Sequence, residues 1–288
     1  MLQKGAALII AGELFLNVLL AAGILFLTAS GLFIVFRLMG IVNLAHGEFI
    51  MLGAYTAYFV GYFNMSPWIS CIAAPIITAI VGLFIERLLM RRLYGKIMES
   101  ILATWGLSML LQQLVITAFG SMPRYVSSPV NQAVSAFGIT YPLYEVLIIA
   151  FAVVLLVTLL WLDRKTQLGA VVRAVIESPE TAAAATGINV NRVYQLSFVV
   201  GSMLAGFAGA VIAPIVTVTP VMGLDYVIRA FLAVLVGGAA AIPSVALGAS
   251  VLGGSESIAS FLWNPVIGYV VVILISVTLM RLRQSQAR

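Results

Sequence analysis

The sequence has 288 residues, of which 62% are hydrophobic and 9% are charged, and its mean hydropathy is +1.14. So little polar surface could not cover a water-soluble domain, and the composition excludes one. The net charge of +5 and the pI of about 9.5 are typical of Lys and Arg in cytoplasmic loops, and we expect no nucleic-acid partner. The expected fold class is all-α: residues 1–288 form a single integral membrane domain, a polytopic bundle of transmembrane helices.

Apolar runs long enough to cross a bilayer follow one another along the chain. The first, residues 6–36, is too long for one ordinary span, and we expect one span followed by a shorter helix after Gly31. Further spans are predicted at residues 47–63, 68–89, 101–119, 143–162 and 193–218. Glycines and a proline interrupt residues 226–262, which predicts two short or broken helices there, and the last span covers residues 266–280. The total is about eight spans, or up to ten if broken pieces count.

A polar stretch from Asn43 to Glu48 lies between two of these apolar runs and contains the only histidine, His46. A polar group at membrane depth costs free energy, so it usually faces a cavity, a partner or a pathway. Asn43 and Gly47 also suit an interruption of a helix. We therefore expect a helix break beside a pathway through the membrane, formed by Asn43, His46, Gly47 and Glu48. A structural role for His46, as a hydrogen-bond partner that pins the broken helix, is at least as well supported.

Basic residues indicate the orientation. They gather in three clusters, around residues 87–96, 164–192 and 281–288, whereas residues 120–141 carry one charge, Arg124. The positive-inside rule puts the three clusters, and with them the C-terminus, in the cytoplasm and residues 120–141 outside. For the second and third clusters to lie on the same side, residues 226–262 must cross twice or re-enter.

The predicted cytoplasmic segment, about residues 163–192, contains signals for a short helix. Ser178 can cap its first turn, Pro179 suits its first position, and Glu180 favours the positive end of the helix dipole. Alanines follow, and Gly187 can end the helix in a left-handed conformation. A helix of about two turns is not stable alone, so we expect it to pack on a partner through its small alanine face. The alternative is an ordinary amphipathic loop helix.

Three stretches carry a resemblance to a known family: GIVNLAHGEFIMLGAY at residues 40–55, RAVIESPETAAAATGIN at 173–189, and GLDYVIRAF at 223–231. They resemble, in this order, the signature, the coupling segment and a second-half stretch of the permease subunits of branched-chain amino-acid ABC importers. The chain departs from that pattern at Arg37, Ala240 and Ser244 and in its last residues.

The resemblance implies an import subunit of a bacterial inner membrane that moves branched-chain amino acids into the cytoplasm. Permeases for urea and short amides belong to the same family and fit residues 39–55 about as well. The implied partners are a second permease subunit, two ABC ATPase subunits and an extracytoplasmic solute-binding protein. The residues implied in coupling to the ATPase are Glu177, Pro179, Glu180, Ala183, Ala184 and Gly187.

We expect no enzyme activity and no cofactor in this chain. It has no G-x-x-x-x-G-K-[ST] motif, so ATP would be used by the partner subunits. An intramembrane enzyme would need a nucleophile or metal constellation, which one histidine and scattered acids do not supply. A secondary transporter would be expected to contain inverted repeats. The sequence shows only a weak sign of them, since the interrupted stretches near Asn43 and Gly237 lie in opposite halves of the chain.

Other polar residues in apolar runs suggest contacts between helices. Gln112 and Gln113 could bond across helices. Asp225 and Arg229 are four residues apart and are expected to pair on one helical face. Glu256, after two glycines, is expected to face the bundle.

Overall fold

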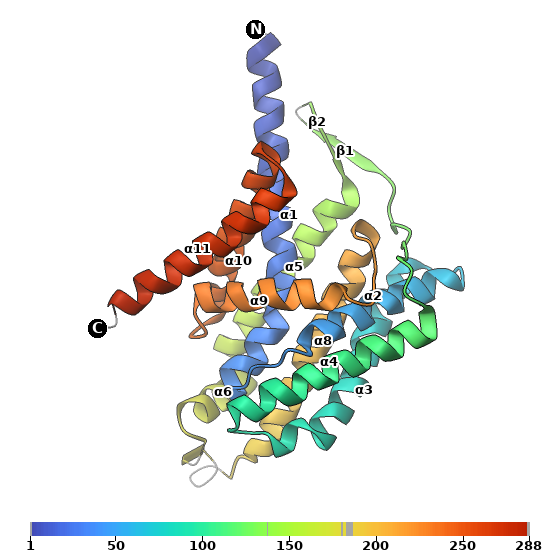
Figure 1. The fold of residues 1–288 in the computed structure, drawn as a ribbon. Helices are drawn as coiled ribbons and strands as arrows, with labels where there is room; N and C mark the ends of the chain where they lie inside the picture. Colours follow the sequence, from blue (N-terminus) through green and yellow to red (C-terminus); the bar gives the residue numbers. More distant parts are fainter. Residues whose placement is uncertain (1, 137, 180, 183–186, 287–288) are drawn as a thin grey trace.

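The computed structural model describes residues 2–136, 138–179, 181–182 and 187–286. It is a bundle of helices with one small β-hairpin (Figure 1). The helices and strands are α1 (Leu2–Met39), α2 (His46–Tyr62), η1 (Pro67–Ile69), α3 (Ser70–Leu88), η2 (Met90–Arg92), α4 (Ile97–Phe119), β1 (Ala133–Ala136), β2 (Ile139–Pro142), α5 (Leu143–Lys165), α6 (Gln167–Glu177), α8 (Val190–Ile212), η3 (Ala213–Ile215), α9 (Met222–Gly237), α10 (Ile242–Leu262) and α11 (Pro265–Gln286).

The predicted polytopic helical bundle is confirmed. Seven helical segments in the described part of the chain are long and apolar enough to cross a membrane. They correspond to α1 from Leu8 onward, α3, α4, α5, α8, α10 and α11 as far as Leu282. The helices α2 and α9, of 17 and 16 residues, are shorter than a full span of about 20 residues. These two short helices explain why a count of spans depends on how broken pieces are treated.

The prediction for the first apolar run is wrong in one respect. A single helix, α1, covers 38 residues without an interruption at Gly31. Gly31 instead lies against α8, where a Cβ atom added to it would come within 2.3 Å of the Gly201 carbonyl oxygen. Small residues allow helix backbones to approach this closely in a membrane, so Gly31 is a packing residue and not a helix end.

The interruption predicted within residues 226–262 is confirmed. The helix α9 ends at Gly237, and α10 begins at Ile242 with Pro243 in its first turn. Proline is compatible with the first turn because the N–H group that it lacks would have no partner within the helix there. The chain therefore turns between α9 and α10, and the side of the membrane on which it does so stays a prediction.

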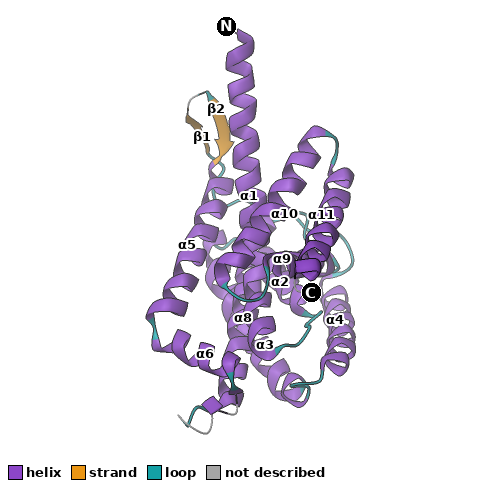
Figure 2. Ribbon diagram, turned by 90° about the vertical axis from the view of Figure 1, so that its left-hand side faces the viewer, coloured by secondary structure: helices purple, strands orange, loops and turns teal. Residues whose placement is uncertain are grey.

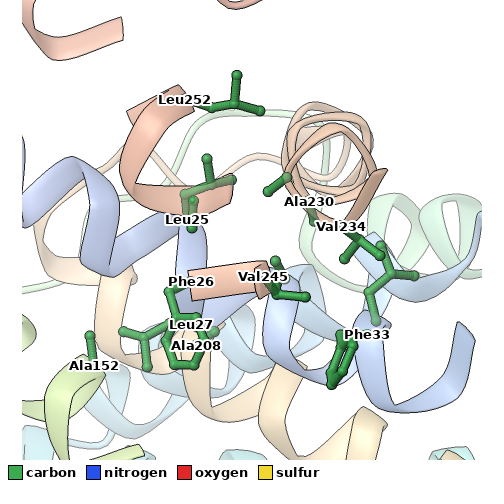
Figure 3. Close-up of a cluster of buried hydrophobic side chains, with 14 of the residues drawn as sticks. Leu25, Phe26, Leu27, Phe33, Ala152, Ala208, Ala230, Val234, Val245 and Leu252 are labelled. Atoms are coloured by element: carbon green, nitrogen blue, oxygen red, sulfur yellow. The ribbon is translucent and has the colours of Figure 1, made fainter. Parts of the chain in front are cut away.

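The core surrounds α1, which packs against α5, α8, α9 and α10. Figure 3 shows part of this core, in which side chains from these five helices meet. Its labelled members are Leu25, Phe26, Leu27, Phe33, Ala152, Ala208, Ala230, Val234, Val245 and Leu252. In Figure 2, α5 lies on one side of α1 and α10 and α11 lie on the other. The long central helix therefore connects two groups of helices.

A β-hairpin within the predicted outer loop was not expected from the sequence. Strand β1 pairs antiparallel with β2, and Ala133 lies opposite Pro142. The Tyr141 hydroxyl donates a hydrogen bond of 2.9 Å to Oδ1 of Asn17, which ties the hairpin to the N-terminal half of α1. At the other end of α1, Arg37 lies 3.9 Å from Asp163 of α5. The helix α1 therefore runs from the hairpin end of the molecule to the α6 end (Figure 2).

Candidate functional site

The predicted helix break is present between α1 and α2. Gly40 has a φ of +61°, a conformation that favours glycine, and it follows directly after the last residue of α1. The connection is anchored to α4, because the Leu44 N–H donates a 3.1 Å hydrogen bond to Oγ1 of Thr104. The His46 N–H then donates to the Asn43 carbonyl at 3.3 Å, and α2 begins at His46.

Glu48 lies in the first turn of α2 and is completely buried. Its Oε1 atom accepts hydrogen bonds from Ser108 Oγ at 2.7 Å and from Gln112 Nε2 at 2.8 Å, both on α4. The positive end of the α2 dipole also favours a carboxylate at this position. Gln112 therefore bonds across helices as predicted, whereas Gln113 bonds to Thr117 within its own helix.

Asn43 and His46 are also buried, each with 1% of its surface exposed. The His46 ring packs against α1, where a Cβ added to Gly31 would lie 3.0 Å from His46 Cε1. Among the described residues, Nε2 of His46 and both polar side-chain atoms of Asn43 have no hydrogen-bond partner. The structure thus brings all four predicted residues, Asn43, His46, Gly47 and Glu48, into the interior of the chain, and a position along a pathway stays a prediction.

Gly47, the fourth residue, lies where α2 meets α9. It is the second residue of α2 and lies inside the helix, not at the break. A Cβ atom added to it would lie 2.0 Å from the carbonyl oxygen of Gly223 in α9, and one added to Gly223 would lie 2.6 Å from the Gly47 carbonyl oxygen. The two glycines therefore allow the backbones of α2 and α9 to touch.

We expect the Glu48 contacts to hold α2 against α4. Replacing Glu48 by Leu leaves the buried donors of Ser108 and Gln112 without their partner, and should cost on the order of 2 kcal/mol of stability. Glu48→Gln keeps an oxygen that can accept both bonds and should cost less. The thermal unfolding midpoint of the purified protein in detergent measures both effects. Gln113→Leu is the control, because it removes a polar side chain of α4 that does not contact Glu48, and an equal loss of stability there would contradict the assignment.

The segment predicted to be cytoplasmic and to couple to an ATPase is described in part. Glu177 is the last residue of α6. The Ser178 hydroxyl accepts the Thr181 N–H at 3.4 Å, so Ser178 caps the turn that contains Pro179, as predicted. Gly187 has a φ of +66°, which agrees with the left-handed conformation expected for it. Glu180, Ala183 and Ala184 lie outside the described residues.

Ion pairs fix the position of α6. Asp163 Oδ1 lies 3.9 Å from Arg37 Nη1 and 3.4 Å from Arg173 Nη1, and Arg173 also donates to the Asp163 carbonyl oxygen. An apolar cavity of about 370 Å³ lies beside this cluster, between α1, α5, α6 and α8. Arg37, a departure from the expected pattern, thus links α1 to Asp163, near the end of α5 and the start of α6.

A second buried carboxylate, Glu86 of α3, was missed in the sequence because it lies close to basic residues that suggested a solvent-exposed loop. Only 1% of its surface is exposed. It accepts hydrogen bonds from the Tyr94 hydroxyl and from Gln195 Nε2, the latter at 2.6 Å. Burial and the bond to Glu86 raise the pKa of Tyr94, which therefore keeps its proton. This cluster ties α3 to α8.

Asp225 and Arg229 do not form the pair expected from their spacing. The ion pair found for Arg229 in the described residues is with Glu256 of α10, at 3.0 Å, and Asp225 is exposed. Glu256 therefore faces a neighbouring helix, as predicted. No group of three or more His, Cys, Asp or Glu side chains that could hold a metal ion occurs within the described residues.

Comparison with known proteins gives consistent results. A family profile described as the permease component of the branched-chain amino acid transport system matches residues 14–280. The chain is 28% identical over 253 residues to the high-affinity branched-chain amino acid transport system permease protein LivH of Escherichia coli, with 81% of each chain covered. It is 27% identical over 249 residues to the corresponding permease protein BraD of Pseudomonas aeruginosa, with 80% of each covered.

A solved structure has the same fold. The structure described as PsaBC from Streptococcus pneumoniae in complex with Fab aligns over 98% of this chain and 95% of its own chain, with a TM-score of 0.53 and 13% sequence identity. At that identity the likeness shows the fold alone.

Proposed function

Because this chain belongs to the family of permease components of the branched-chain amino acid transport system, we propose that it carries leucine, isoleucine and valine into the cytoplasm. It is a permease subunit of an ATP-binding-cassette importer. The observation that carries the solute assignment is the match to permeases named for branched-chain amino acids, which covers about four-fifths of the chain. Urea and short amides are the alternative solutes.

The partners in this proposal are a second permease subunit, two ATPase subunits and an extracytoplasmic solute-binding protein. The sequence has no P-loop motif, so hydrolysis of ATP falls to other chains. The segment that begins at α6 is the candidate contact for an ATPase, through Glu177, Pro179, Glu180, Ala183, Ala184 and Gly187. Its capping by Ser178 and the left-handed Gly187 support a short helix between them.

The proposed location is the inner membrane of a bacterium, with α6 and the C-terminus in the cytoplasm. Basic residues near α6 and at the end of α11 support this orientation through the positive-inside rule. The hairpin, at the opposite end of α1, is then outside, where the binding protein delivers its solute.

For the helix break, we favour a structural role over direct contact with solute. Glu48 is bonded to α4 and His46 packs on α1 within the same protomer. In this role the residues of the helix break hold α2 in the orientation that shapes the solute pathway. These residues are Asn43, His46, Gly47 and Glu48. Contact between these side chains and the solute would require a conformation in which they become exposed.

Reconstitution into liposomes tests the proposal. The complete importer, with loaded binding protein outside and ATP inside, should accumulate leucine, and this chain alone should neither hydrolyse ATP nor accumulate leucine. Competition with isoleucine, valine, urea and acetamide identifies the solute class. Uptake of urea without leucine would replace the amino-acid assignment. Uptake by the chain alone, driven by a proton or sodium gradient, would contradict the importer assignment.

A further inference from the structure

A charged cluster lies on the side of the bundle formed by α9, α10 and α11, away from α5 (Figure 2). Arg229 Nη1 of α9 lies 3.0 Å from Glu256 Oε1 of α10, and Nη2 of Arg229 donates to the Tyr269 hydroxyl of α11. The guanidinium carbon lies 4.3 Å from the Tyr269 ring centre and 5.9 Å from that of Tyr226. Three helices therefore bring one cation, one anion and two aromatic rings together.

The cluster lies between the ends of helices that include two long and apolar enough to cross a membrane. Glu256 precedes the end of α10, at Leu262, by six residues, which corresponds to roughly 9 Å along a helix. Both α10 and α11 belong to the segments long and apolar enough to cross a membrane. Figure 1 shows α9 crossing the bundle between the hairpin end and the α6 end. A charge at this position cannot reach the headgroup region as easily as one at a helix end.

The cluster is nevertheless not enclosed by the protein. The side chains of Arg229 and Glu256 keep 23% and 19% of their surface exposed. The helices α9 and α11 also carry exposed apolar side chains, such as Ile228 and Val266 at 50% and 70%. Because lipid tails solvate charges poorly, an ion pair that opens onto such a face must meet water or a polar partner in the assembled importer.

We propose that the Arg229–Glu256 pair is a transient contact site for the α-amino and α-carboxylate groups of a zwitterionic amino acid crossing the membrane. Arg229 would take the carboxylate and Glu256 the ammonium group. The pair has no net charge, so a solute with one positive and one negative group can open it while each charge keeps an opposite partner. The site rests on the proposed amino-acid import, since urea has neither charge.

The neighbouring groups fit this assignment. Tyr269 and Tyr226 place their rings beside the guanidinium, where they limit the directions from which a solute can approach. Asp225, one turn earlier on α9, is exposed and adds a second negative charge for an ammonium group. An apolar solute side chain can lie against the exposed aliphatic residues of the same face.

The rival interpretation is that the ion pair only joins α9 to α10. A purely structural pair can often be replaced by two apolar side chains of similar size with little loss of stability. A contact with the solute is lost in this replacement, because the two charged groups that would bind the amino acid are both removed. The variant Arg229→Met/Glu256→Met therefore separates the two roles, and Glu256→Gln removes one charge with minimal change in shape.

The experiment uses the complete importer in liposomes, with binding protein saturated with leucine, and measures leucine uptake and ATP hydrolysis together. We expect the leucine imported per ATP hydrolysed to fall roughly tenfold or more in both variants, the loss expected when a charge-assisted contact is removed. In the double variant, the thermal unfolding midpoint and the maximal ATPase rate should remain near those of the unmodified protein. Gln113→Leu, which removes a polar side chain of α4 outside the cluster, should leave all three unchanged.

The outcomes separate the site from the function on which it rests. An unmodified importer that takes up no leucine contradicts the proposed function. Normal leucine uptake per ATP hydrolysed in both variants overturns the proposed site. An equal fall of the uptake rate and the ATPase rate also overturns it, because that result indicates a purely structural ion pair. If the double variant does not assemble, the leucine imported per ATP hydrolysed in Glu256→Gln decides whether the pair contacts the solute.

Discussion

Replacing Gly47 by Val should abolish assembly and transport. A Cβ atom at Gly47 would lie 2.0 Å from the Gly223 carbonyl oxygen and 2.5 Å from its carbonyl carbon, and both are backbone atoms that cannot rotate away. The helices α2 and α9 would have to separate, which would also disturb the Glu48 contacts one residue further on. Overpacking that forces the backbone to shift typically costs roughly 1–3 kcal/mol and occasionally more, and here it acts on a contact between two backbones.

Gly61 provides a matched control within α2. It is exposed, and a Cβ atom added there would meet nothing within 4 Å. Gly61→Val should therefore assemble and transport normally, although both changes put a β-branched residue into the same helix. The measurements are the yield of complete importer after purification and the rate of leucine uptake. Because the first added carbon already causes the clash, Gly47→Ala should also impair assembly, and normal behaviour of both Gly47 variants would show that α2 and α9 do not touch here.

Replacing Ala184 by Arg should reduce uptake by at least about tenfold while the permease remains in the membrane, because an unpaired charge at a protein interface costs several kcal/mol. This prediction comes from the sequence, since Ala184 lies outside the described residues. Its support is the alanine run between Ser178 and Gly187, which offers a small surface that a partner can approach closely.

Gln167→Arg is the control for the coupling prediction. Gln167 is the first residue of α6, is exposed, and precedes the alanine run within the same predicted cytoplasmic segment. Both variants add a positive charge, so a general effect of charge would reduce uptake equally in the two. Uptake into membrane vesicles and ATPase stimulation by loaded binding protein should fall in Ala184→Arg alone. Normal transport in that variant would exclude a close contact at this position.

Much of the fold was predictable from the sequence because a membrane span is a local property. A helix satisfies its own backbone hydrogen bonds, so a run of about 20 apolar residues is sufficient to predict a span. Residues 143–162 and 266–280 were recognised in this way, and α5 and α11 contain them. The interruptions at Asn43 and Gly237–Pro243 were also readable, since glycine and proline change the backbone locally.

The same local reasoning failed where partners decide the structure. The long α1 is one helix, and its Gly31 packs on Gly201 of α8, a contact that the length of an apolar run does not reveal. The spacing of Asp225 and Arg229 suggested a pair along one helix, but α10 brought Glu256 closer to Arg229. Likewise, the β-hairpin depends on Tyr141 reaching Asn17 of α1.

For the candidate site, the sequence by itself determined which residues are unusual, and tertiary structure decided what they do. Asn43, His46 and Glu48 stood out because polar groups are costly in an apolar environment, whatever the fold. That Glu48 bonds to Gln112, 64 residues away, depends on how α2 and α4 pack. Gly47 likewise acquired its role only when α9 was placed against it. The transfer cost of a side chain is a property of that residue, whereas a hydrogen-bond partner or a backbone contact exists only once two helices have packed together.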